Sequence, residues 1–157
     1  GYIFGYTAHS LELFASRSWL VAFFMFCTAY TGEAFFLAAT TLAGVINFFG
    51  VPASILGNEM AIKIGRQNWI CFVMLTSAIL GIALAAATGQ GWWAIALLAT
   101  GHSIFIMADS ATLTAGLVTS AQPQIKGAAM GLHSLMGFGG GLLVKEATIV
   151  EEKVSPL

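Results

Sequence analysis

The chain has 157 residues, of which 58% are hydrophobic and 8% are charged, and its formal net charge is −1. Six basic and seven acidic side chains are too few to cover a soluble domain of this length, so the composition predicts a membrane protein. The nearly balanced charge gives no attraction for nucleic acid, and two isolated cysteines, Cys27 and Cys71, form neither a disulfide framework nor a zinc motif.

The first predicted membrane span covers residues 6–30 and is unusually polar, because it carries His9, Glu12 and Arg17. Four almost uncharged runs follow it along the chain. Since about 17–25 apolar residues cross the hydrocarbon core, each run predicts a transmembrane helix. The sequence therefore predicts an all-α membrane protein with about five transmembrane helices. The four later spans are expected at residues 35–56, 68–88, 92–118 and 127–144.

The joints between these spans are short, so neighbouring helices should pack antiparallel, with the joints at the two membrane surfaces. Lys63, Arg66 and Lys126 all fall in the second and fourth joints, whereas the first and third contain no Lys or Arg. By the positive-inside rule the second and fourth joints are expected to be cytoplasmic. The four joints lie near residues 31–34, 57–67, 88–91 and 122–126.

The chain does not begin with methionine, and its apolar start lacks the pattern of a signal peptide, so we expect a fragment of a longer membrane protein. Its last residues, 145–157 (KEATIVEEKVSPL), are rich in charge and unlike the preceding spans. We expect this tail to be an unstructured appendage, from a truncated or frame-shifted end, and assign it no function.

The charged stretch GNEMAIKIGR, residues 57–66, interrupts the apolar pattern. Glu59 and Lys63 are four residues apart and can pair on a helical turn, and Gly65 can take a left-handed conformation that ends the turn. Arg66 would then lie at the start of the next helix. These charges either belong to a functional loop or serve only to fix the topology.

The same stretch resembles the signature loop of the major facilitator superfamily, which joins the second and third helices and recurs between the eighth and ninth. Lys63, Gly65 and Arg66 match its basic, glycine and arginine positions, whereas Ile62 and Gln67 stand where it has aspartate and a final basic residue.

Two further stretches resemble bacterial transporters of this superfamily. Residues 5–24 are similar to the seventh helix, and residues 108–141 are similar to the tenth helix, the following turn and the eleventh helix. The resemblance implies that the five spans are helices seven to eleven of a twelve-helix protein of the bacterial inner membrane, whose N-terminal half is missing from the chain.

The resemblance also implies secondary active transport of a small solute by alternating access. Lys63, Gly65 and Arg66 would form a cytoplasmic gating loop. The chain has no phosphate-binding glycine loop, so a proton gradient is the expected driving force, and we expect neither an enzyme nor a cofactor.

Ionisable side chains inside a span are costly and by default suggest function, and the candidates are His9, Glu12, Arg17, His102 and Asp109. His9 and Glu12 are neighbours on one helix face, and His102 and Asp109 share a face two turns apart. Glu12 or Asp109 would exchange a proton or hold a cation, and Arg17 would act as a counter-ion or bind an anionic substrate.

More ordinary interpretations remain open. Glu12 and Arg17 can lie near the cytoplasmic entrance and reach water with their long side chains. His133 on the fifth span is expected to be a packing residue hydrogen-bonded to a neighbouring helix. Pro52 is expected to kink or end the second span, and a role as a gating hinge is a second possibility.

Two other functions compete with transport. A membrane enzyme could hold a metal with His9, Glu12, His102 and Asp109, although no close ligand motif is present. A structural membrane subunit without a pathway of its own would tolerate free replacement of Glu12 and Asp109. The identity of the solute and the direction of transport stay open.

Overall fold

The computed structural model describes residues 1–154, and the side chains of residues 1–144. Within this part of the chain all regular secondary structure is α-helical, as the sequence predicts. The helices in chain order are α1 (Tyr2–Thr31), α2 (Ala39–Phe48), α3 (Gly50–Ile64), α4 (Arg66–Ala86), α5 (Trp92–Ala108), α6 (Ser110–Ser120) and α7 (Lys126–Val154).

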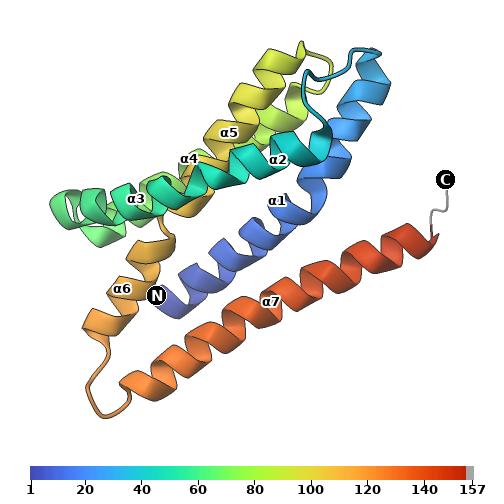
Figure 1. Cartoon of the computed structure of the whole chain (residues 1–157). Helices are drawn as coiled ribbons and strands as arrows, with labels where there is room; N and C mark the ends of the chain where they lie inside the picture. Colours follow the sequence, from blue (N-terminus) through green and yellow to red (C-terminus); the bar gives the residue numbers. More distant parts are fainter. Residues whose placement is uncertain (155–157) are drawn as a thin grey trace.

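Five helical segments are long and apolar enough to cross a membrane, which confirms the predicted number of spans. Consecutive segments run antiparallel (Figure 1). Two of them consist of a pair of helices separated by a single residue, α2 with α3 and α5 with α6. The segments are Tyr2–Thr31, Ala39–Ile64, Arg66–Ala86, Trp92–Ser120 and Lys126–Val144.

The second span is interrupted at Phe49, three residues before Pro52. A proline has no backbone N–H and its ring clashes with the carbonyl four residues earlier, so α2 cannot continue regularly into α3. The amide of Phe49 instead donates to the carbonyl of Ile46, in a tighter turn. Pro52 therefore lies beside an interruption in the middle of the span and does not end it, because the span continues to Ile64.

The fourth span is interrupted at Asp109, and this break is braced by neighbouring helices. The indole N–H of Trp69, on α4, donates to the carbonyl of Ala108 over 3.2 Å. Gly57, on α3, lies so close to the same carbonyl that a Cβ atom there would clash with it. The broken fourth span therefore packs directly against the broken second span.

The second span differs from its predicted bounds at both ends. It begins at Ala39 rather than 35, and it ends at Ile64 rather than 56, so most of the predicted joint at 57–67 is the end of α3. Gly65 alone separates α3 from α4, and its φ of 98° confirms the predicted positive-φ turn, a conformation that favours glycine.

Two further expectations about charged segments are wrong. Glu59 and Lys63 both lie on α3 and are exposed, but their charged groups form no ion pair within the described side chains. A surface pair of this kind contributes little, so water replaces it easily. The backbone of residues 145–154 continues α7 rather than forming an unstructured appendage, consistent with the good helix propensity of its Lys, Glu and Ala residues.

The two ends of the bundle differ in their side chains. At one end the turn at Gly65 lies near the end of α6, where Arg66 donates a hydrogen bond to Thr119 over 2.6 Å. We call this the basic end. At the other end Phe35 and Phe36 pack on Trp92, and we call this the aromatic end. The predicted grouping of joints by side is thereby confirmed.

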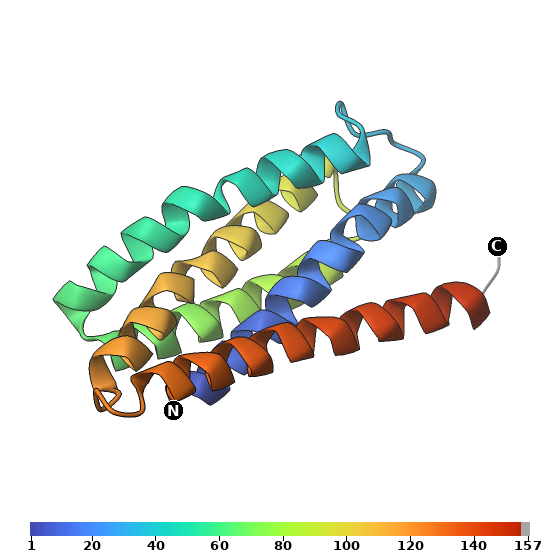
Figure 2. The ribbon, with the colours of Figure 1, turned by 60° about the horizontal axis from the view of Figure 1, so that its bottom comes forward.

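Helix α7 lies at the edge of the bundle, alongside α1 (Figures 1 and 2). Its glycines allow this approach, since Cβ atoms at Gly137 and Gly141 would clash with Tyr6 and Phe14 of α1. The Gly137-x-x-x-Gly141 spacing is thus used as a helix-packing surface, as expected for membrane helices.

Candidate functional site

The most deeply buried polar side chains meet where α1 passes the break in the fourth span. Nδ1 of His9 lies 2.8 Å from Oδ1 of Asp109, and both side chains are at most 3% exposed. The contact is short, but it is not aligned as a straight hydrogen bond, so its main component is electrostatic. His9 and Asp109, which the sequence analysis lists as separate candidates on two spans, therefore form one buried pair.

This pair extends into a polar cluster that crosses three helices. The ring of Tyr6 stacks on His9 with centroids 5.8 Å apart and on His133 with centroids 3.6 Å apart. Nε2 of His133 lies 3.3 Å from Oγ1 of Thr114. We call these five residues, His9, Asp109, Tyr6, His133 and Thr114, the polar cluster.

The polar cluster has unused hydrogen-bonding capacity. Nδ1 of His133 and Oγ1 of the neighbouring Thr112 are buried, and neither has a hydrogen-bond partner in the described structure. Buried polar atoms nearly always have partners, so a site of this kind is suited to hold water or a polar ligand.

The break at Asp109 explains how the pair forms. Asp109 is the single residue between α5 and α6, and α6 resumes with its own hydrogen bond from Leu113 to the carbonyl of Asp109. Irregular backbone at membrane depth is tolerated only where protein or a cavity surrounds it. Here His9, Trp69 and Gly57 enclose it from three other helices.

Glu12 and His102 do not join the polar cluster. Glu12 is partly exposed and forms no hydrogen bond or ion pair with any described side chain, although His9 lies one turn away. His102 does lie toward α1, in a pocket of about 190 Å³ that Ser16 and Trp19 also line. However, its Nδ1 is 3.0 Å from the carbonyl of Ser77 on α4, so His102 and Asp109 do not act on one another.

Arg17 is exposed and lies away from the His9–Asp109 pair. Its Nη2 atom is 3.9 Å from the sulfur of Met107 on α5. Of the predicted gating residues, Arg66 bonds to Thr119, Gly65 makes the turn, and Lys63 is exposed on the last turn of α3. These three residues lie at the basic end, and the polar cluster lies deeper in the bundle.

The ligand set considered for a metal enzyme is not assembled. Within the side chains of residues 1–144, no group of three His, Cys, Asp or Glu residues could hold a metal ion. His9 and Asp109 meet, but His102 faces α4 and Glu12 stands apart. The geometry gives no support to the metal-enzyme alternative.

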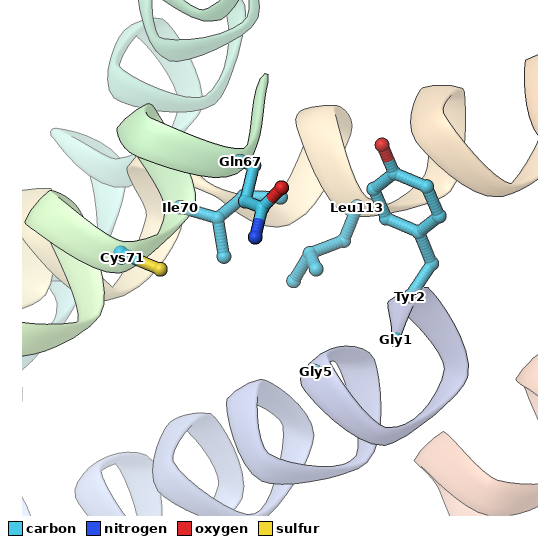
Figure 3. A pocket seen from close by; sticks show the side chains of 7 residues that line it. All are labelled: Gly1, Tyr2, Gly5, Gln67, Ile70, Cys71 and Leu113. Carbon is cyan, nitrogen blue, oxygen red and sulfur yellow. The ribbon is translucent and has the colours of Figure 1, made fainter. Parts of the chain in front are cut away.

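A pocket of about 330 Å³ opens between the starts of α1 and α4 and the side of α6 (Figure 3). Leu113 lines it and packs on Gly5, 2.9 Å from where a Cβ atom of Gly5 would lie. Leu113 and Gly5 are each one helical turn from Asp109 and His9. Neither His9 nor Asp109 lines the pocket, and along both helices Leu113 and Gly5 are the lining residues nearest to the buried pair.

Sequence reasoning missed Tyr6, Thr112, Trp69 and Leu113 as parts of this region. Tyr6 had a signal, because it is three residues before His9 on the same helix face. The expectation for His133, a packing residue hydrogen-bonded to another helix, is confirmed by its contact with Thr114.

Fold and site together define a helical, multi-pass membrane protein with a buried His–Asp pair at a broken span. No protein family, curated protein or solved structure matches the chain. Its function must therefore be inferred from the residues themselves.

Proposed function

We propose that this chain belongs to a secondary active transporter that moves a small solute across a membrane by alternating access, driven by protons. The observation that carries the proposal is the buried His9–Asp109 pair beside the break in the fourth span. The resemblance of residues 57–66, 5–24 and 108–141 to the major facilitator superfamily supports the same proposal.

The charge of the pair explains why it suits proton coupling. A neutral imidazole next to a carboxylate carries one net negative charge, and one added proton makes the pair neutral. An uncompensated net charge is more expensive to bury than a pair whose charges cancel. A proton should therefore enter or leave only when the pair gains access to water, which is the property that a proton-coupled transporter needs.

The interrupted spans are the part of the bundle that would move during transport. Substrate and ion sites in transporters lie where spanning helices are discontinuous, and two half-bundles rock about them. Here the break at Asp109 packs against α3 through Gly57 and the carbonyl of Ala108, and Gly50, next to the break at Phe49, packs against Met107. A movement of α6 would separate Asp109 from His9 and open the Leu113–Gly5 contact to the pocket in Figure 3.

The setting of this transporter follows from the same proposal. The basic end would face the cytoplasm of a bacterial cell, by the positive-inside rule. The five spans would be helices seven to eleven of a twelve-helix protein, with the partner half-bundle supplied by an N-terminal half. Lys63, Gly65 and Arg66 would then gate the cytoplasmic side.

The test is transport by the intact protein in lipid vesicles that contain a pH-sensitive dye. Sugars, organic cations and organic anions are added in turn, and proton movement coupled to solute entry identifies a substrate. Asp109→Asn keeps the shape of the side chain but removes its proton. We expect this variant to lose gradient-driven uptake and to keep exchange at equal solute concentrations. Full gradient-driven uptake by Asp109→Asn contradicts proton coupling through this residue.

A further inference from the structure

Arg17 places a cation near the middle of the bundle. Its position within α1 indicates this, and so do the positions of Met107 on the fourth span and Gly50 on the second span. Arg17 is close to the midpoint of α1, and its guanidinium contacts Met107, near the centre of the fourth span. Met107 packs in turn on Gly50, next to the interruption at the centre of the second span. The nearest end of α1 is about 20 Å away along the helix, which is farther than a side chain reaches.

No described carboxylate neutralises this cation. Asp109 is engaged by His9, and the only ion pair among the side chains of residues 1–144 is the one between them. Glu12 is five residues before Arg17, so it projects about 140° away around the helix. Arg17 is nevertheless exposed, and among the described residues its only hydrogen-bond contact is the thioether of Met107.

An exposed, unpaired arginine at this depth is costly unless it faces a water-filled cavity or binds an anion. The other arginine of the chain, Arg66, shows the contrast, because it lies at the basic end and bonds to Thr119. Guanidinium binds the two oxygens of a carboxylate or phosphate through parallel hydrogen bonds, whereas a single uncompensated cation repels cationic solutes.

From this placement we infer that Arg17 is the substrate-binding group for an organic oxyanion, a carboxylate or phosphate ester with an apolar body. This inference rests on the proposed transport function and names its substrate class. The side chain of Met107, whose sulfur lies 3.9 Å from the guanidinium, provides an apolar neighbour for the body of the anion. His9 of the proton-carrying pair and the anion-binding Arg17 are then separate groups on α1, about two helical turns apart.

The chain offers a clean test, because Arg17 and Arg66 are its only arginines. Phenylglyoxal modifies accessible guanidinium groups, and mass spectrometry of the purified protein measures the two sites separately. Benzoate and phenyl phosphate serve as oxyanion probes, benzamide serves as the matched neutral compound, and Arg66 is the internal control.

We expect phenylglyoxal to modify Arg17, and benzoate or phenyl phosphate to slow this by about tenfold when the probe exceeds its dissociation constant about tenfold. Benzamide should not protect Arg17, and no probe should protect Arg66. An unreactive Arg17 overturns the inference, because the residue is then enclosed or paired. Equal protection by benzamide, or equal protection of Arg66, also overturns it.

A second measurement separates this inference from the proposed function. Benzoate should raise the melting temperature of the protein and of Arg17→Lys, but not of Arg17→Gln, and an unchanged effect in Arg17→Gln counts against anion binding. These readouts need no transport. Oxyanion binding at Arg17 without proton coupling at Asp109 would defeat the proposed function alone, whereas coupling without oxyanion binding would defeat the inference alone.

Discussion

The two halves of the bundle are filled by different kinds of side chain. Toward the aromatic end the core consists of packed apolar side chains. Toward the basic end the buried residues include polar ones such as His9, Asp109 and His133, and closely packed glycines such as Gly57. The apolar core comprises Leu20, Phe24, Cys27, Leu42, Ala43, Ile46, Leu84, Ile95 and Ala99.

This difference assigns the two halves different roles, one in stability and the other in the expected movement. Lipid is as apolar as a leucine side chain, so packing rather than water exclusion holds membrane helices together. The aromatic half gains this packing from large interlocked side chains. The basic half contains the break at Asp109 and the buried polar atoms without partners, and we therefore expect it to be the half that changes its conformation.

The largest expected effect comes from emptying the apolar core. Phe24 is fully buried, so Phe24→Ala should lower the free energy of unfolding by about 3 kcal/mol, because the side chains around it would then border a cavity. Unfolding by SDS in mixed micelles measures this. Phe26 on the same helix is 56% exposed, and Phe26→Ala should change stability by no more than about 0.5 kcal/mol. Equal losses at both positions would remove the distinction between core and lipid-facing surface.

A smaller loss of stability is expected for a substitution where the two broken spans touch. A Cβ atom at Gly57 would meet the backbone carbonyl of Ala108, which cannot rotate away, so Gly57→Ala should destabilise the protein by about 2 kcal/mol. Gly44 has open space around its Cβ position, and Gly44→Ala should be neutral or slightly stabilising. The same unfolding assay compares them, and a neutral Gly57→Ala would show that α3 does not brace the break.

The hydrogen bond from Trp69 to the carbonyl of Ala108, at the break in the fourth span, should contribute less to the free energy of unfolding. Trp69→Phe keeps an aromatic ring but leaves the carbonyl of Ala108 without its donor, at a cost of about 1 kcal/mol in a membrane protein. Trp93 is 65% exposed, and Trp93→Phe is the matched control with no expected loss. If both variants unfold alike, the indole bond does not stabilise the break.

The smallest expected effect is a change in the rate of proton leakage, and it concerns the Leu113–Gly5 contact. Leu113→Ala should join the pocket of Figure 3 to the His9–Asp109 pair and speed the decay of an imposed pH gradient in vesicles. Leu117→Ala, one turn further along α6, removes a similarly buried side chain that does not line this pocket. Identical decay rates for the two variants would show that the pocket is not a proton route.

Much of the fold could be predicted from the sequence. The uncharged runs indicated the spans, and Pro52 marked one of the two breaks, because these signals are local. The break at Asp109 had no such signal, since no proline or glycine stands there. It depends on Trp69 and Gly57, which reach it from other helices.

The candidate site was predicted only in part. His9 and Asp109 stood out as costly residues within spans, but periodicity placed them beside Glu12 and His102. Sequence spacing describes neighbours on one helix, and it contains no information about which helices meet. The pairing of His9 with Asp109 depends on the packing of α1 against the broken fourth span.

The central claim is that the His9–Asp109 pair takes up and releases a proton, and infrared difference spectroscopy during a pH titration tests it most directly. A protonated carboxyl group has its own C=O stretching band, separate from that of a carboxylate. We predict a titrating band that persists in Glu12→Gln, disappears in Asp109→Asn, and changes its pH dependence in His9→Gln. A titrating band that survives in Asp109→Asn, or no band at all in the unmodified protein, would contradict the account.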